Sequence, residues 1–574
     1  TTAQPRSALL YKLKVKMLKL SVILLYSMLS VDAGKTCNGT TSDFPEVTTP
    51  LGKVKGSLMT TRLGKTIYAF RGIRYGESPT GQQRFKQAEP VKPWEGTFDA
   101  SKEGPSCGWL ESKLQSEDCL RLNVYTTKLA EAKSAPRPVV VFFHPGGFWS
   151  RSGQSYIYGP EYLLDEDIIL VTCNYRIGAL GFFSTGDSLA PGNLGLKDQV
   201  EVLRFIQKNI RSFNGDPNSV TITGQSAGGW SVSLHLVSPI SKGLFHRAIV
   251  QSGAATYQNP LPPHQKDLAK KLARLLDCPT DTTGSMLLCL NTKPFEDIVA
   301  TLPKFWEWHG DPILVWTPVI EPDVPGIERF LVEQPVESIK HRRFEQVPVI
   351  GGIVKDEFAG VVVGVVQAAR KGDNSVFDDI NANFTTIAPI SYFYERGTNR
   401  SLEISQDLRE FYFKGKPVKK DNYVGLGELY ADSVTIFGVH RFINLIGKYS
   451  SKPVYYYNFA YQGRYSHVYW ADKKPFGVVH EDDLLYLFKK EEFPAIEGND
   501  PEILTLRRMT SMWENFARTG EPIPVGNPDF SGFIWTPFTR ENQAYLEITD
   551  TLQIKKNLYI DRMNEWDKLF PIEY

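Results

Sequence analysis

The chain has 574 residues, of which 42% are hydrophobic and 22% charged, and its formal net charge is +1. This composition is typical of a globular protein, and the near-neutral charge excludes an electrostatic basis for binding nucleic acid or an anionic membrane surface. The length alone would allow roughly four domains of about 150 residues each. Residues 34–574 show no linker, low-complexity stretch or internal repeat, so we interpret them as a single large domain.

The N-terminal 33 residues predict a targeting segment. An apolar run over residues 20–29 follows Met17 and a lysine, and Val31 and Ala33 are small residues where a signal peptidase would cleave. We therefore expect a removable signal peptide over Met17–Ala33, preceded by upstream residues 1–16. A membrane anchor is the alternative, but the run is short for a bilayer span. Because no apolar run closes the chain, we expect secretion without a transmembrane or glycolipid anchor.

Cysteines and glycosylation sequons agree with an extracellular protein. The six cysteines fit an oxidising compartment. Cys173 lies in an apolar strand pattern, where a buried free thiol is expected, and Cys37 has no evident partner. Two close pairs could each close a small loop, namely Cys107 with Cys119 and Cys278 with Cys289. Sequons for N-glycosylation begin at Asn38, Asn383 and Asn399.

Short apolar strand patterns alternate with helical patterns along the chain. The first continuous apolar run covers residues 138–143, as expected for a parallel strand buried on both faces. Further strand patterns follow at 168–172, 220–223, 247–250, 347–350 and 453–457, and apolar residues at helical spacing predict a helix over 196–210. This alternation predicts an α/β fold with helices on both faces of a mostly parallel sheet.

Two long tracts interrupt this alternation. They cover about 255–345 and 360–450 and mix helical with irregular patterns. We expect them to be insertions above the carboxyl edge of the sheet, where such segments commonly form the walls of a binding gorge.

A nucleophile motif ends the strand pattern at 220–223. Residues 224–228 are Gly-Gln-Ser-Ala-Gly, a G-x-S-x-G pattern with an apolar helical pattern behind it. A strand–turn–helix of this kind lifts the hydroxyl of Ser226 off the end of the sheet, and the glycines permit the close backbone approach that the turn requires. Short matches to this pattern also arise by chance, so the assignment depends on partners elsewhere in the chain.

A serine hydroxyl needs an imidazole to take its proton and a carboxylate to hold that imidazole. His480 lies in a glycine-punctuated loop after the last core strand pattern, where it could reach the turn, and His467 is its rival. Asp356 and Glu357 both follow the strand pattern at 347–350. Local sequence does not choose between these two carboxylates.

The turn after residues 138–143 offers oxyanion donors. It is His-Pro-Gly-Gly and resembles the H-G-G-G turn of lipases and esterases. Pro145 has no N–H, so the expected backbone donors are Gly146 and Gly147, joined by Ala227 after the nucleophile. The alternative is a tight turn without a catalytic role.

Together these motifs resemble the type-B carboxylesterases of the cholinesterase–carboxylesterase family over residues 45–570. The resemblance rests on Ser-Glu-Asp-Cys-Leu-Arg-Leu-Asn-Val at 116–124, on the serine motif at 224–229, and on the segments 70–75 and 83–85. It implies an α/β-hydrolase fold, with Glu357 as the triad acid and His480 as the base. It also implies the disulfides Cys107–Cys119 and Cys278–Cys289, and the ion pairs Arg84–Glu117 and Arg176–Asp198.

Within that family the chain is similar to insect esterases, both the juvenile hormone esterases and the secreted venom carboxylesterases. Gln225 stands where many members have glutamate, which argues against a cationic substrate. Phe358 stands where glycine usually follows the acid, so we expect a differently shaped loop. Trp230 is bulky where small residues are usual, and we expect it to pack in the core. Trp109 has the spacing of the choline-binding tryptophan of cholinesterases, which we interpret as coincidence.

The sequence thus predicts a secreted serine hydrolase that cleaves small carboxylic esters through an acyl-enzyme, without a metal or cofactor. A juvenile hormone esterase is the narrower alternative. A non-catalytic adhesion or binding relative is the alternative from another class, although such relatives usually lack part of the triad.

Overall fold

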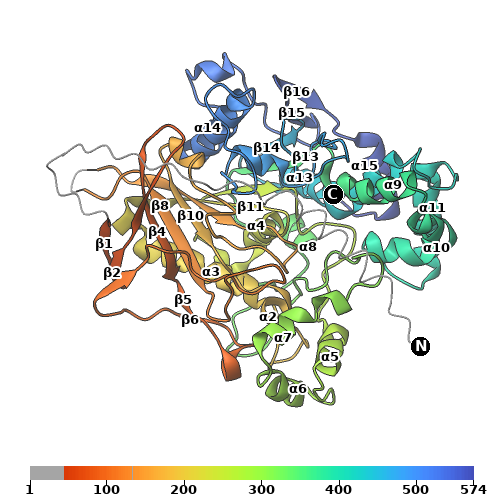
Figure 1. Ribbon diagram of the computed structural model, residues 1–574, viewed down its shortest axis with the longest axis horizontal. Helices are drawn as coiled ribbons and strands as arrows, with labels where there is room; N and C mark the ends of the chain where they lie inside the picture. The colour runs from red at the N-terminus through yellow and green to blue at the C-terminus, as the bar shows by residue number, and fades with distance from the viewer. Residues whose placement is uncertain (1–43, 132–133) are drawn as a thin grey trace, which may run out of the picture.

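The computed structural model describes residues 44–131 and 134–574 (Figure 1). The expected signal peptide at Met17–Ala33, together with Cys37 and the Asn38 sequon, lies outside the described residues. Among the residues described, no helix combines the length and the apolar character needed to cross a bilayer.

An eleven-stranded sheet forms the centre of the molecule. Seven adjacent strands of this sheet run parallel to one another, and antiparallel pairs extend the sheet at both edges. The mostly parallel sheet predicted from the sequence is therefore confirmed. In spatial order the strands are β16 (Leu552–Lys556), β15 (Ala544–Ile548), β14 (Val454–Phe459), β13 (Val349–Val354), β12 (Arg247–Gln251), β11 (Gly215–Gln225), β9 (Arg137–Phe143), β10 (Ile169–Cys173), β8 (Arg121–Thr126), β4 (Thr66–Arg74) and β3 (Ser57–Thr60).

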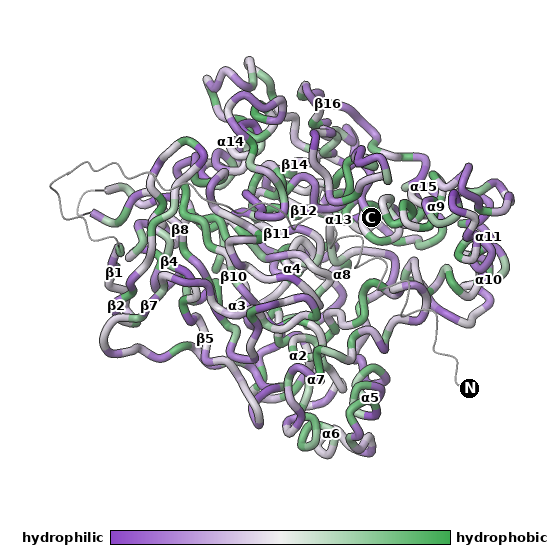
Figure 2. Tube along the Cα trace, viewed as in Figure 1, coloured by the Kyte–Doolittle hydropathy of each residue, from purple (hydrophilic) through white to green (hydrophobic). Residues whose placement is uncertain are grey.

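Helices cover both faces of this sheet, as the continuous apolar strands require. Side chains of β9 point alternately to the two faces: Val139, Val141 and Phe143 belong to one buried cluster, and Val140 and Phe142 to the other. The strands at the centre of the sheet are mostly apolar, whereas many of the outer segments are polar (Figure 2). The first cluster includes side chains of α3 (Leu194–Asn209), α4 (Ala227–Val237) and α13 (Phe437–Tyr449), and the second those of α14 (Ile503–Thr519).

The remaining elements lie around this core. Helices α5 to α7 and α9 to α11 form lobes at two sides of the molecule (Figure 1). The tract 360–450 is only partly an insertion, because its last helix, α13, packs on β13 and β14. The other helices are α2 (Gly178–Phe182), α5 (Lys266–Leu275), α6 (Thr283–Leu290), α7 (Phe295–Ala300), α8 (Pro335–Lys340), α9 (Val362–Arg370), α10 (Ser375–Ser391), α11 (Asn399–Phe413), α12 (Val424–Ala431) and α15 (Ile560–Leu569). Two small sheets pair β1 (Glu46–Thr49), β2 (Gly52–Lys55) and β7 (Thr97–Asp99), and β5 (Gly76–Glu77) with β6 (Glu89–Pro90).

Covalent and ionic links stabilise the segments around the sheet. The structure contains the disulfides Cys107–Cys119 and Cys278–Cys289, and Cys173 is a buried free thiol. Both ion pairs implied by the family resemblance are present as two-point contacts: Arg84 with Glu117, and Arg176 with Asp198 at 2.7 Å for each of its two nitrogens. The latter pair is almost fully buried, so removing one partner would leave an uncompensated charge.

Candidate active site

The serine turn joins β11 to α4 at the carboxyl edge of the sheet. Ser226 has φ 57° and ψ −121°, a conformation that is strained for a residue with a side chain. The glycines around it are required by contact: a Cβ on Gly228 would lie 1.9 Å from the Phe143 carbonyl oxygen, and one on Gly253 would lie 2.2 Å from the Ser226 carbonyl oxygen. The Ser226 amide donates to the Gln251 carbonyl at 2.8 Å, which ties the turn to β12.

A second turn, which follows β9, brings backbone amides close to the serine turn. Gly146 and Gly147 have φ values of 114° and 59°, and a Cβ on Gly146 would lie 2.1 Å from the Ser150 carbonyl oxygen. Both glycines line a cavity together with Ser226 and Ala227. Ala227 is the first residue of α4, where backbone N–H groups have no partner within the helix.

Glu357 and His480 meet beside this cavity. The Glu357 side chain is fully buried, and its Oε2 lies 2.6 Å from His480 Nδ1. Its Oε1 accepts a hydrogen bond of 2.9 Å from the Val354 amide, and the His480 amide donates to the Glu357 carbonyl at 2.9 Å. The structure therefore brings Glu357 to the ring, whereas the competing carboxylate of Asp356 accepts a hydrogen bond of 2.9 Å from the Val478 amide.

His467, the rival of His480 in the sequence analysis, has other partners. His467 Nδ1 lies 2.8 Å from Asp482 Oδ1, and its Nε2 lies 2.9 Å from Lys490 Nζ. His235 and His440 are buried, and burial lowers their pKa values to about 3 and about 4. Both rings are therefore neutral at physiological pH.

Two side chains that the sequence analysis singled out for other reasons contact the His480 ring. Gln225 Nε2 lies 3.2 Å from His480 Nε2, and the Phe358 ring lies over the imidazole with 4.1 Å between centroids. The available signal was their position, since Gln225 precedes the serine and Phe358 follows the acid. Within residues 44–131 and 134–574 no hydrogen bond joins the ring to Ser226 Oγ, although both line the cavity. Catalytic contacts of this kind often shorten only when substrate binds.

A buried polar network lies beneath the two turns. Asp483 Oδ2 accepts hydrogen bonds from Gln251 Nε2 at 3.0 Å and from the Tyr457 hydroxyl at 2.9 Å. Burial raises the pKa of Asp483 to about 6, and these two hydrogen bonds oppose that rise. Because the Gln251 carbonyl also anchors the Ser226 amide, one residue connects this network with the serine turn.

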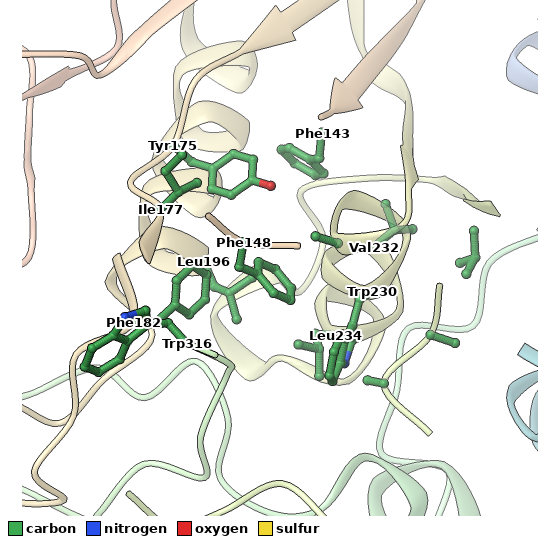
Figure 3. Packing of buried hydrophobic residues seen from close by; sticks show 14 of the residues in the cluster. Phe143, Phe148, Tyr175, Ile177, Phe182, Leu196, Trp230, Val232, Leu234 and Trp316 are labelled. Carbon is green, nitrogen blue, oxygen red and sulfur yellow. The ribbon is translucent and has the colours of Figure 1, made fainter. Parts of the chain in front are cut away.

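The cavity above these groups has a volume of about 370 Å³ and is largely aromatic. Its aromatic lining comes from distant segments: Trp109, Trp149, Trp230, Tyr257, Trp306 and Phe358. Trp109, whose spacing we interpreted as coincidence, therefore lines the cavity. Trp230 both lines the cavity and packs in the core, with its ring 5.5 Å from Phe148 (Figure 3). Charged side chains are fewer, and they are Glu111, Arg151 and Glu481.

The sheet order and the serine turn define a protein of the α/β-hydrolase class. The family model described as the carboxylesterase family matches residues 43–566. The chain therefore belongs to the carboxylesterase family and is a carboxylic ester hydrolase.

Similar proteins come from several insects. Esterase FE4 of Myzus persicae is 36% identical over 92% of this chain and 93% of its own length. The juvenile hormone esterase of Tribolium castaneum is 35% identical over 93% of this chain and 95% of its own length. Among solved structures, the crystal structure of juvenile hormone esterase from Manduca sexta, with OTFP covalently attached, has a TM-score of 0.80 and 27% identity, covering 92% of this chain and 100% of that one.

Proposed function

We propose that this protein is a secreted serine esterase that cleaves carboxylic esters through an acyl-enzyme on Ser226. The observation that carries the proposal is the 2.6 Å contact between Glu357 Oε2 and His480 Nδ1, at the wall of the cavity that Ser226 lines. With Nδ1 held by a carboxylate, Nε2 is the ring nitrogen that accepts the serine proton, once it gives up its contact of 3.2 Å with Gln225 Nε2.

The steps follow from this arrangement. His480 takes the proton of Ser226 as the hydroxyl oxygen attacks the ester carbonyl carbon. The resulting oxyanion accepts hydrogen bonds from the amides of Gly146, Gly147 and Ala227, each of which contributes on the order of 3 kcal/mol to the transition state. His480 then gives its proton to the departing alcohol and later activates the water that hydrolyses the acyl-enzyme, while Glu357 orients the ring.

Covalent labelling tests this proposal directly. An organophosphate should react once per molecule, and peptide mass spectrometry should locate the adduct on Ser226. The Ser226→Ala variant is the matched control and should remain unlabelled. A wild-type protein that takes no label would instead support the non-catalytic adhesion or binding role.

A juvenile hormone esterase is a second candidate. Its support is the similarity to two proteins of that name, together with Gln225 in place of an acidic residue beside the serine. The test compares kcat/KM for juvenile hormone with that for simple short-chain esters. A rate on the hormone no better than on those esters excludes the narrower role and leaves the esterase proposal intact.

Secretion and glycosylation belong to the same proposal. Asn383 and Asn399 are both exposed, as glycan acceptors must be. Expression in insect cells should release the protein into the medium, and glycosidase treatment should lower its apparent mass. Retention of an unglycosylated protein inside the cells would contradict this part of the proposal.

A further inference from the structure

Two residues beside the proposed site have a backbone conformation that favours glycine. Arg151 follows the turn that holds Gly146 and Gly147, and Glu481 follows His480. Each has a φ of 74°. Glycine adopts this left-handed region without steric cost, whereas a charged residue with a Cβ does not. The presence of two long charged side chains at these positions therefore requires an explanation from what they contact.

The two side chains form an ion pair across the cavity wall. Arg151 Nη2 lies 3.8 Å from Glu481 Oε1, and both residues line the cavity. The other carboxylate oxygen of Glu481 lies 3.1 Å from Nζ of Lys490, a lysine that is only 2% exposed. Glu481 thus connects Arg151, which follows the turn of Gly146 and Gly147 (the oxyanion turn), with the buried Lys490, which lies beyond the turn that holds His480 (the His480 turn).

Arg151, Glu481 and Lys490 form a charged array, and their charges depend on one another. Burial raises the pKa of Glu481, but Lys490 and Arg151 lower it more strongly, so the pKa lies well below its ordinary value and the carboxylate stays charged. Lys490 in turn is buried and needs the carboxylate as its counter-ion. A buried ion pair with these contacts restrains geometry more than it adds stability.

The array also reaches the other side of His480. Lys490 Nζ lies 2.9 Å from His467 Nε2, and His467 Nδ1 lies 2.8 Å from Asp482 Oδ1. The same carboxylate group accepts a hydrogen bond of 2.9 Å from the Val479 amide. The residues immediately before and after His480 are therefore both held by groups that converge on Lys490.

From this geometry we propose that Glu481 is a positioning residue that, through Arg151 and Lys490, holds the His480 turn in register with the oxyanion turn. The inference rests on the proposed esterase function, because it assigns those two turns their roles. It explains why charged residues occupy two positions that suit glycine. Small displacements of a general base relative to the oxyanion donors lower the rate while leaving substrate affinity less affected.

The first test removes the charge and keeps the side-chain shape. In Glu481→Gln, kcat for a small ester should fall by about 10-fold or more while KM changes by less than about 3-fold. Arg151→Gly should lower kcat in the same way, and the Arg151→Gly, Glu481→Gly double variant should be no slower than the worse single variant, because both changes break one link. A rise in KM with unchanged kcat would show that the pair binds substrate, and would overturn the proposal.

The pH profile provides a readout that loss of folding would not produce. The anionic groups that act on the protonated His480 ring are Glu357, Glu481 and Asp483, and the nearby cations are Arg151 and Lys490. Removing the Glu481 carboxylate destabilises the protonated ring, so the acidic limb of kcat/KM should move to lower pH in Glu481→Gln. Removing the cation in Arg151→Gly should move it to higher pH. Unshifted limbs in both variants would contradict the proposal.

Two further variants keep the test decisive. Glu481→Gly suits the backbone conformation, and Lys490 retains Glu492 at 3.8 Å, so this variant should fold even if Glu481→Gln does not. Lys414→Gly is the matched control, because Lys414 has φ 53° but is exposed and outside the array. It should keep wild-type kinetics. If the wild-type protein is labelled on Ser226 and the Glu481→Gly variant keeps the wild-type kcat, the positioning role is refuted while the esterase function stands.

Discussion

The proposed reacting centre and the cavity walls of this protein are built differently. Ser226 directly follows a strand of the central sheet, and Gly146 and Glu357 come shortly after the ends of two others. Close backbone contacts at the glycines of the two turns leave no room for a Cβ. Much of the wall comes from segments outside the sheet, including Tyr257, Trp306 and the 434–438 stretch. Under the esterase proposal, the sheet positions the reacting groups, and we expect the inserted segments to determine which ester fits.

Loss of the nucleophile should have the largest effect. Ser226→Ala should lower turnover by roughly four to six orders of magnitude, because no hydroxyl remains to form the acyl-enzyme. Since the backbone conformation is set by neighbouring contacts, the circular dichroism spectrum and melting temperature should change little. Ester hydrolysis near the wild-type rate by the purified variant would show that the reacting centre does not lie at this turn.

Variants of the neighbouring carboxylates Glu357 and Asp356 test which of the two is the triad acid. Glu357→Gln should reduce kcat by about 10³- to 10⁴-fold, because an amide cannot hold the imidazole in the reactive tautomer. Asp356→Asn is the matched control and should stay within about 10-fold of wild type, because its carboxylate contacts the Val478 amide. Steady-state kinetics on one short ester measures both. The reverse ranking would make Asp356 the triad acid.

Changes in the wall should alter selectivity rather than chemistry. Trp306→Ala should enlarge the cavity and raise the kcat/KM ratio of bulky to short esters by about 10-fold, with kcat on a short ester within about 3-fold of wild type. Trp308 belongs to the same inserted segment, but its indole nitrogen donates to Asp379 Oδ2 at 2.7 Å, and it does not line the cavity. Trp308→Ala should therefore leave the ratio unchanged. Equal shifts in both variants would indicate general loosening of the insertion.

Two buried histidines, His144 in the turn after β9 and His235 in α4, should affect stability rather than turnover. Burial lowers the pKa of His144 to about 4 and that of His235 to about 3, from an ordinary value of 6.5. The unfolded chain therefore binds these protons first, and stability is lost as pH falls from about 6.5 to about 4, by on the order of 3 kcal/mol for each ring. Melting temperatures across this range should fall less steeply in His235→Gln. An unchanged slope would show that His235 does not contribute.

Much of the fold followed from local patterns. The apolar run at 138–143 and the helical spacing at 196–210 correspond to β9 and α3, because periodicity records which faces of an element are buried. The glycines around residue 226 indicated the turn, since only a close backbone approach needs them there. The limits of the insertion at 360–450 were wrong, because the pattern of α13 does not reveal that it packs on the sheet.

The sequence by itself determined the strands, the strained serine turn and the family, because these depend on neighbouring residues and short motifs. Local sequence left Glu357 and Asp356 open, the family resemblance implied Glu357, and the tertiary structure brings its carboxylate to the His480 ring. Only the tertiary structure placed Phe358 over that ring and Trp109 at the cavity. Only there does Arg151 meet Glu481, 330 positions further along the chain. Such contacts depend on the order of strands in the sheet and on the path of inserted loops, and neither is encoded in the spacing of residues along the chain.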